Sequence, residues 1–260
     1  MTEQTPAPVT LERRGHVAIV TLNRPAARNA ISAAMAETIE GFVQEIEADN
    51  AIRVAILRAE GPIFCAGADL AEVAAGRGMS LARPETGFAG FVQARRSKPW
   101  IAALQGPSHG GGTEMILTCD LIVAAETAAL VLPEVKRGLI AGAGGSFRVA
   151  RYLPRPLAIE MLVTGQPLPA PRAHALGIVN RLVPTPAEVL DEALRLAELV
   201  ASMSPLAVRQ SLRVVRAAAD QGEAELLALQ DDANGIVLSG PDVKEGAGAF
   251  IEKRQPEWRT

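Results

Sequence analysis

Apolar positions recur with two different periods along the chain. Short apolar runs bounded by turn-forming residues predict strands, and apolar residues three and four apart predict helices. Between residues 35 and 46 the helical period predicts an amphipathic helix, capped by Ser32. Together these patterns predict an α/β protein. The predicted strands cover residues 9–12, 17–22, 54–57, 98–103, 121–125, 129–132 and 178–183, the first two forming a hairpin around Arg14-Gly15.

The pattern changes after residue 185. Ala, Leu, Glu and Arg then recur with helical spacing, and Pro205, Gly222 and Pro241 separate three further helices. This tail has more apolar surface than a lone hairpin could bury, so we expect it to pack on the core and on other subunits. We therefore expect three regions along the chain. They are a disordered N-terminus at 1–8, an α/β core at 9–195 and a helical oligomerisation region at 196–260.

One glycine-rich stretch joins a predicted strand to a predicted helix. Three glycines at 110–112 follow the apolar run 98–103 and open a helix at residues 113–118. Consecutive glycines are entropically costly and are kept where the backbone takes unusual dihedral angles or lies against another molecule. Free N–H groups at a helix start favour a developing negative charge, and Glu114 places a carboxylate beside them. The stretch therefore predicts an oxyanion cradle with an acid–base group attached.

Three other loops carry weaker signals. Residues 60–70 are rich in small side chains and follow a strand, at the edge where α/β folds bind ligands, although this loop alone favours an ordinary turn. Residues 138–145 form a glycine-rich loop, for which close helix packing is at least as good an interpretation as a phosphate site. Residues 76–87 lose all periodicity and predict a mobile surface segment that lies over a pocket.

Glu114 and Glu134 are the strongest pair of candidates for acid–base chemistry. Each follows a break marked by glycine or proline at the end of a strand, and they are 20 residues apart, enough for the chain to return to the same edge. Two converging carboxyl groups can divide proton transfer between a base and an acid. Alternatively, Glu114 complements a helix dipole and Glu134 is a solvated charge. Spacing alone leaves both interpretations open.

Composition and residue spacing argue against several classes of function. The formal net charge is −3 and the chain has only four lysines, so we expect no face that binds nucleic acid. Cys65 and Cys119 lack metal or redox spacing, and His16, His109 and His174 lack ligand spacing. No Gly-x-Ser-x-Gly elbow is present. We therefore expect neither a metal site nor a serine nucleophile.

No segment predicts secretion or membrane insertion. The first ten residues lack the apolar centre of a signal peptide. The longest apolar stretch, residues 121–132, is interrupted by Glu126 and is too short to span a bilayer. Without a disulfide framework, the chain is expected to work in the reducing cytoplasm, with no membrane partner.

Taken in order, the motifs resemble the crotonase superfamily, the enoyl-CoA hydratase/isomerase family. The resemblance covers nearly the whole chain, and so many motifs in sequence make it far more specific than any single glycine loop. The matching segments are 23–25 with 29–30, 64–70, 98–99, 110–114, 119–120, 132–134, 138–139, 142–145, 164–165, 175–179 and 250–254.

The resemblance implies a spiral core of β-β-α units followed by a helical trimerisation region, assembled as a homotrimer or a dimer of trimers. It implies an acyl-CoA thioester ligand and no separate cofactor. By matching positions, the N–H groups of Ala68 and Gly111 would form the oxyanion hole. The residues implied in CoA binding are Ala66, Asp69 and Leu70 along the adenine and pantetheine path, with Lys253 reaching a CoA phosphate in a neighbouring subunit.

Both glutamates of the hydratase members match, at Glu114 and Glu134, whereas isomerase-type members commonly keep one. The resemblance therefore implies an enoyl-CoA hydratase, with Glu114 activating water and Glu134 delivering a proton to the α-carbon. The alternatives are an isomerase, a dehydratase of a substituted acyl-CoA, or a relative that binds CoA or RNA without turnover. The RNA alternative is disfavoured by the acidic sequence pI near 5.7.

Three positions depart from the usual family pattern. Ala141 stands where many members have proline, residues 146–148 read Ser-Phe-Arg in place of Thr-Gln-Arg, and Ser108-His109 replaces a small or apolar pair. His109 motivates a hypothesis, because its imidazole would favour a polar acyl group if it faced the acyl pocket. The alternative is a side chain that packs behind the loop.

Overall fold

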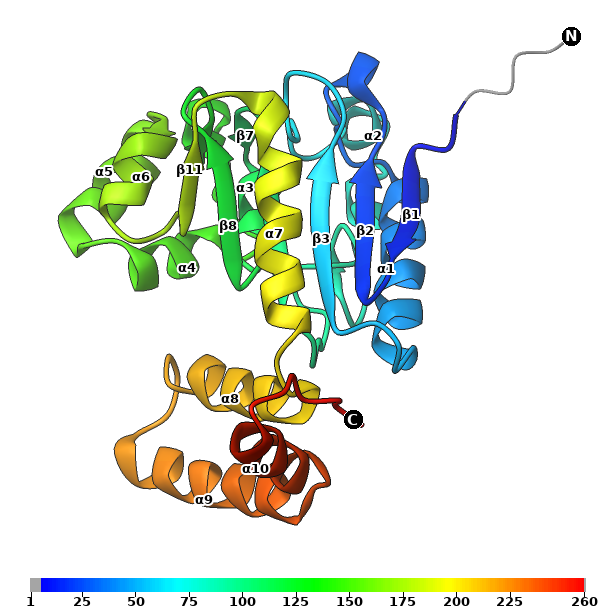
Figure 1. The fold of residues 1–260 in the computed structure, drawn as a ribbon. Helices are drawn as coiled ribbons and strands as arrows, with labels where there is room; N and C mark the ends of the chain where they lie inside the picture. The colour runs from blue at the N-terminus through cyan, green and yellow to red at the C-terminus, as the bar shows by residue number, and fades with distance from the viewer. Residues whose placement is uncertain (1–5, 260) are drawn as a thin grey trace, which may run out of the picture.

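The computed structural model describes residues 6–259, with a six-stranded sheet at its centre (Figure 1). The strand order is β1-β2-β3-β6-β8-β11, where β1 and β2 are antiparallel and all other neighbours are parallel. The predicted α/β class is therefore confirmed. The strands are β1 (Val9–Arg14), β2 (Val17–Leu22), β3 (Val54–Ala59), β6 (Trp100–Leu104), β8 (Leu121–Ala125) and β11 (Arg181–Val183).

Two helices cover the two faces of this sheet (Figure 1). On one face α1 (Ala33–Ala48) buries the apolar residues that its sequence period predicts, and the Ser32 side chain caps it by accepting a hydrogen bond from Met35 N–H. On the other face α7 (Val189–Ala201) packs on the strand residues that point the opposite way. Alternate residues of the central strands therefore enter two separate cores, which explains the continuous apolar runs in the sequence.

A smaller layer beside the main sheet carries the glycine-rich stretch. Its three strands follow the order β10-β9-β7, and the helices of this part of the chain pack around them. The elements are β7 (Ser108–His109), β9 (Ala129–Val131), β10 (Leu168–Pro169), α3 (Gly111–Ile116), α4 (Gly145–Tyr152), α5 (Arg155–Thr164) and α6 (Ala170–Ala175).

The segment at 76–87, which shows no period in the sequence and is predicted to be a mobile surface segment, contains short regular elements. After α2 (Leu70–Ala74) it forms the 3-10 turn η2 (Gly78–Leu81), then β4 (Ala82–Arg83) pairs antiparallel with β5 (Gly87–Phe88). Arg83 and Thr86 both bond to Glu40 on α1, which fastens the hairpin to the core. Two-residue strands are too short to produce a readable period.

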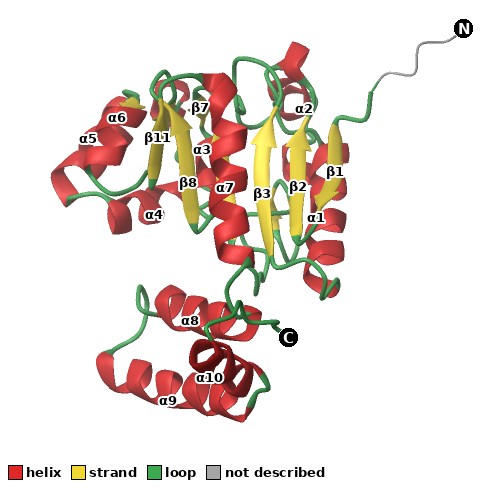
Figure 2. Ribbon diagram, viewed as in Figure 1, coloured by secondary structure: helices red, strands yellow, loops and turns green. Residues whose placement is uncertain are grey.

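The C-terminal helices form a separate layer below the sheet (Figure 2). These are α8 (Pro205–Ala217), α9 (Glu223–Ser239) and α10 (Asp242–Glu252). Arg216 on α8 forms a two-pronged ion pair with Asp120, at 2.8 and 2.7 Å, which ties this layer to the core. The region boundary predicted between 195 and 196 falls inside the continuous helix α7, so the turn into the last layer comes after Ala201.

At the N-terminus, the Asn23 side-chain amide donates a hydrogen bond to the carbonyl oxygen of Ala7, and its backbone N–H donates to that of Pro8. These two residues belong to the range 1–8, for which disorder stays a prediction. The part of that prediction at 1–5 lies outside the described residues. In residues 6–259 no helix combines the length and the apolar character needed to cross a membrane.

Candidate active site

Two loops meet at the start of α3. Gly67 has φ +89°, and a Cβ atom there would lie 2.9 Å from the His109 carbonyl oxygen and 3.2 Å from the Gly111 nitrogen. The loop that contains Ala68 is therefore in backbone contact with the glycine-rich stretch. Only glycine permits both the left-handed conformation and the close approach.

Ala68 and Gly111 each have a backbone N–H at this junction. Gly110 precedes α3 as its N-cap, with φ 53° and ψ −124° and no side-chain cap. Within the part of the chain that the structure describes, neither N–H donates a backbone hydrogen bond. Two unpaired donors on touching loops can bind a single carbonyl oxygen, as an oxyanion cradle requires.

Asn29 fixes the loop that leads to Ala68. Its buried side chain accepts a hydrogen bond from Arg24 N–H at 2.8 Å and donates to the carbonyl oxygens of Glu60 and Ile63, at 2.8 and 2.9 Å. One amide thereby joins the segment after β2 to the segment after β3. This network holds the segment that leads into the oxyanion loop without any regular secondary structure.

Glu114 lies in the first turn of α3 and is only 3% exposed. Its Oε1 accepts a hydrogen bond of 2.8 Å from Gly145 N–H, at the start of α4. Burial raises the pKa of Glu114 to about 7 against the opposing Gly145 bond; Glu134 adds to the rise, while Ala143 N–H and Arg148 oppose it. Near neutral pH this carboxyl group therefore populates both protonation states, as acid–base catalysis requires.

Glu134 begins the 3-10 turn η3 (Glu134–Arg137), directly after Pro133. A Cβ atom on Gly110 would lie 3.0 Å from Glu134 Oε1, so the carboxyl group lies against the glycine-rich stretch. Its Oε2 is buried without a hydrogen-bond partner. Burial raises the pKa of Glu134, against its own backbone N–H and Arg137. An unpartnered, desolvated carboxyl oxygen is suited to hold a proton and donate it to a bound molecule.

The structure thus brings the two glutamates to the same end of α3, where they interact electrostatically. Spacing alone leaves this open, because the return of the chain from Glu114 to Glu134 depends on how β8 and β9 cross from the main sheet to the small one. The site combines two N–H donors with two carboxyl groups of raised pKa.

The Phe88 ring covers Gly111, one of the two residues of the predicted oxyanion cradle. A Cβ atom on Gly111 would lie 2.4 Å from the Phe88 ring, so the β5 end of the hairpin packs directly on the start of α3. Residues 6–259 contain no cluster of three or more His, Cys, Asp or Glu side chains able to hold a metal ion.

Comparison with known proteins identifies the family. The model of the enoyl-CoA hydratase/isomerase family matches residues 12–260. The chain belongs to this family. It is 37% identical to a mevalonyl-coenzyme A hydratase of Aspergillus fumigatus, over 94% of this chain and 92% of the relative. It is 36% identical to a carnitinyl-CoA dehydratase of Proteus mirabilis, over 96% and 97% of the two chains. A crystal structure of an enoyl-CoA hydratase from Mycobacterium tuberculosis superposes with a TM-score of 0.93, at 40% identity, and the match covers 97% of this chain and 98% of that one.

The predicted family resemblance and the predicted crotonase-type fold are both confirmed for this enoyl-CoA hydratase/isomerase family member.

The residues predicted to line the CoA path have varied surroundings. Asp69 caps α2, accepting a hydrogen bond from Ala71 N–H at 3.0 Å, and forms a 2.6 Å ion pair with Arg24. Leu70 is more than half exposed, and Ala66 donates its N–H to the Arg28 carbonyl oxygen. Their contacts to a ligand stay predictions.

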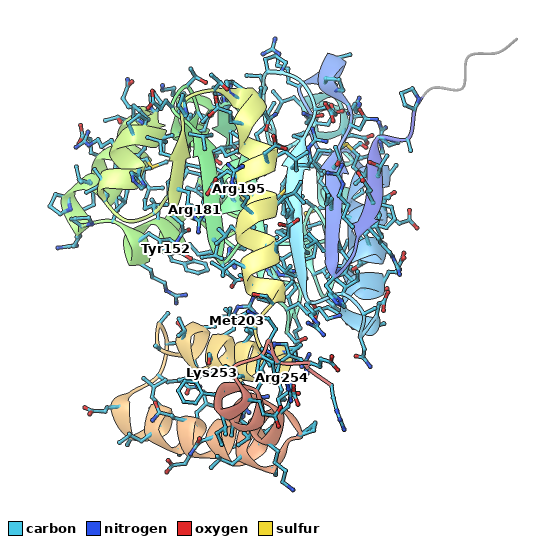
Figure 3. The ribbon with its side chains drawn as sticks, viewed as in Figure 1. Tyr152, Arg181, Arg195, Met203, Lys253 and Arg254 are labelled. Carbon is cyan, nitrogen blue, oxygen red and sulfur yellow. The ribbon has the colours of Figure 1, made fainter. Side chains whose placement is uncertain are left out.

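Lys253 lies far along the chain, after α10 in the C-terminal layer (Figure 3). It takes a left-handed conformation, with φ 55°, and its side chain is exposed. This layer lies below the sheet, whereas α2 and the loop before it lie at the opposite end (Figure 1). The family resemblance implies that Lys253 reaches a CoA phosphate in a neighbouring subunit, and this contact stays a prediction.

His109 is half-buried, next to the oxyanion glycines. Its backbone N–H donates to the Cys65 carbonyl oxygen at 2.8 Å. Burial lowers the pKa of the imidazole, and Arg137 and Arg28 lower it further. The ring is therefore neutral at pH 7. Whether it faces a bound acyl group stays a hypothesis.

Sequence reasoning misses Gly145 and Phe88 as parts of this family member's site. Gly145 donates a hydrogen bond to Glu114 although the two residues are 31 positions apart in the sequence, with β8, β9 and η3 between them. Phe88 directly follows the segment 76–87, which shows no period, and lies in the two-residue strand β5. The glycine-rich run at 142–145 is the available signal for the first of these, and as a local pattern it indicates only a phosphate loop or a packing contact.

Proposed function

We propose that this protein hydrates a 2-enoyl-CoA thioester to a 3-hydroxyacyl-CoA. The observation that carries the proposal is the meeting of Glu114 and Glu134 at the start of α3, next to the unpaired N–H groups of Ala68 and Gly111. Related enzymes named as hydratases and as a dehydratase perform the same class of reaction, in one direction or the other.

The two N–H groups would bind the thioester carbonyl oxygen. Hydrogen bonds to this oxygen draw electrons from the conjugated double bond, so the β-carbon becomes electrophilic. They also stabilise the enolate that forms when water adds. Because donors fixed in the backbone need no reorganisation, they stabilise this charge more than solvent would.

Glu114 would accept a proton from water as its oxygen bonds to the β-carbon. The hydrogen bond from Gly145 N–H favours the carboxylate form, which this role requires. Glu134 would donate a proton to the α-carbon from its unpartnered Oε2. Water thereby contributes a hydroxyl group to the β-carbon while the α-carbon gains one proton, and proton exchange between the two carboxyl groups and solvent restores the starting state.

The second candidate is dehydration of a substituted 3-hydroxyacyl-CoA, which is the same reaction in reverse. The 36% sequence identity with a carnitinyl-CoA dehydratase supports this candidate. An isomerase would need only one of the two glutamates, and the presence of both therefore favours hydration or dehydration. We further propose that catalysis needs no cofactor beyond the CoA of the substrate, and that the enzyme works in the cytoplasm as a homotrimer or a dimer of trimers.

The test follows the loss of the conjugated-thioester absorbance with short and long trans-2-enoyl-CoA substrates, and identifies the product by mass. Glu114→Gln and Glu134→Gln should each lower the rate about a hundredfold to ten-thousandfold. Glu126→Gln, at an exposed position between β8 and β9, is the control and should keep the wild-type rate. Wild-type rates in either active-site variant would overturn the assigned roles.

A further inference from the structure

Arg148 occupies an unusual position for a cation. It lies on α4, half-buried, and its guanidinium group donates to two backbone oxygens, from Nη1 to Ala143 at 2.9 Å and from Nη2 to Val92 at 2.9 Å. Among residues 6–259 the ion pairs between side chains do not include Arg148. Burial lowers the pKa of this group, and the charge of Glu114 opposes that effect. A partly desolvated cation without an ion pair is costly, so its position calls for an explanation.

The first bond holds the loop that contacts Glu114. The Ala143 carbonyl oxygen accepts the hydrogen bond from Arg148. The backbone N–H groups of Ala143 and Gly145 interact with the Glu114 carboxyl group. Gly144 has φ +104°, and a Cβ atom there would lie 2.0 Å from Arg148 Nη1. The guanidinium group thus packs directly on the loop that also contacts the Glu114 carboxyl group.

The second bond reaches the segment on the other side of the site. Val92 follows β5, and its N–H donates to the Phe88 carbonyl oxygen at 3.2 Å. Phe88 is the residue whose ring lies against Gly111. One side chain therefore connects the loop that holds Glu114 with the turn that covers the oxyanion glycine.

We propose that Arg148 is a positioning residue for Glu114. It fixes the Ala143–Gly145 backbone that orients the carboxyl group, and its positive charge favours the carboxylate form that accepts a proton from water. The charged groups that act on Glu114 are Glu134 from η3, which favours the protonated form, and Arg148 from α4, which opposes it. This inference rests on the proposed function, because it assigns Glu114 the role of base.

The chain offers a matched control. Arg151 lies one turn later on α4, and its guanidinium carbon is 5.0 Å from the centre of the Phe147 ring, the same distance as that of Arg148. It pairs with Asp220 at the surface and makes no bond to the loop or to Val92. Substitution of Arg151 removes an equal charge from the same helix without touching the site.

The experiment measures kcat and kcat/KM between pH 5.5 and 9.5 for Arg148→Met, Arg148→Lys and Arg151→Met. Arg148→Met removes a charge that favours ionised Glu114, so the acid limb of kcat/KM should move to higher pH. The loss of kcat/KM relative to wild type should therefore be severalfold larger at pH 6 than at pH 9. Arg148→Lys should keep the wild-type limb and lower kcat at every pH, because an ammonium group cannot bond both carbonyl oxygens. Arg151→Met should match wild type.

Three results would decide against Arg148. The first is an unshifted acid limb of kcat/KM in Arg148→Met together with a wild-type kcat in Arg148→Lys. The second is a shift of the acid limb in Arg151→Met equal to that in Arg148→Met. The third is an Arg148→Lys variant whose acid limb shifts as it does in Arg148→Met. If Arg148→Met does not fold, Arg148→Lys and Arg151→Met still test the positional part through kcat.

A direct titration separates this inference from the proposed function. The Glu114 carboxyl group would be followed by carbon-13 NMR of glutamate-labelled enzyme, with the signal assigned by its loss in Glu114→Gln. A higher titration midpoint in Arg148→Met than in Arg151→Met supports Arg148 even if the wild-type enzyme hydrates none of the substrates tried. Equal midpoints overturn the electrostatic part even if hydration is found.

Discussion

Glu114 shows how one residue meets opposite requirements of stability and catalysis. Its carboxyl group is nearly inaccessible to solvent, so the charged form is costly, yet hydration requires that form as the base. Two backbone N–H groups and a nearby arginine reduce the cost without removing it, and the pKa stays raised at about 7. The folded protein therefore stores some instability in the residue on which the proposed chemistry depends.

Replacement of this carboxyl group should stabilise the protein at high pH. The pKa of Glu114 is raised from 4.5 to about 7 in the folded state, so the proton is held more tightly after folding. The resulting stabilisation is present below pH 4.5 and is lost as the pH rises through about 7. At pH 8.5 the buried charge costs about 3 kcal/mol, which neutral glutamine avoids.

We therefore expect Glu114→Gln to be almost inactive but to have a higher Tm than wild type at pH 8.5 and an equal Tm at pH 5. Thermal unfolding followed by circular dichroism at the two pH values tests this expectation. Glu126→Gln, at the surface, controls for the general loss of one negative charge. An equal Tm difference at both pH values would count against a buried, titrating Glu114.

At the residue scale the sequence predicts which residues carry the chemistry better than it predicts where those residues lie in the fold. Glu114 and Glu134 stand out because each follows a marked break in the chain. Their convergence is not predictable, since it depends on the path of two strands that belong to different sheets. Gly145, Phe88 and Arg148 are missed for a related reason: each acts through a tertiary contact that leaves no local pattern.

Elements with a clear period are predicted well. The hairpin β1–β2, the helix α1 with its Ser32 cap and the three C-terminal helices all lie where the pattern puts them. Shorter elements are predicted less well. The strand predicted at 178–183 is reduced to Arg181–Val183, because residues 178–180 form a turn that bonds back to α6 and β8. Burial of Ile178 and Val179 makes this turn as apolar as a strand.

The loop between β3 and α2 is the element whose conformation the site requires most. Gly67 combines φ +89° with contacts to His109 and Gly111, so alanine there would bring both backbone strain and a clash at the oxyanion donors. We expect Gly67→Ala to lower kcat/KM about a hundredfold or more, which is the scale for loss of one oxyanion donor.

Gly177→Ala is the matched control for this substitution. Gly177 has φ +83°, and a Cβ atom added there would have no heavy atom within 4 Å, so alanine brings strain alone. Both variants should lose Tm from the backbone strain, Gly67→Ala more because of the added clash, and only Gly67→Ala should lose activity. Steady-state kinetics with thermal unfolding tests this pair, and equal activity in the two variants would contradict an oxyanion role for the Gly67 loop.

At the scale of the whole molecule, the C-terminal layer leaves much apolar surface exposed. Phe250 is 86% and Ile251 78% exposed, at the end of α10, and Leu227 and Leu238 on α9 are more than half exposed. Scattered apolar residues are normal at a surface, but a set this large on two packed helices is typical of an interface. Lys253 directly follows α10 beside this surface, and its implied contact with a CoA phosphate of a neighbouring subunit is a prediction of the same kind.

We expect these side chains to hold the proposed trimer together. Phe250→Asp with Ile251→Asp would place two charges where an apolar contact forms, and burial of an unpaired charge costs several kcal/mol. Light scattering after gel filtration should give three or six times the chain mass for wild type and a smaller assembly for the double variant. Met79→Asp, at an equally exposed position on η2, is the control and should leave the mass unchanged. A wild-type monomer would reject the trimer, whereas a double variant of unchanged mass would move the interface away from the end of α10.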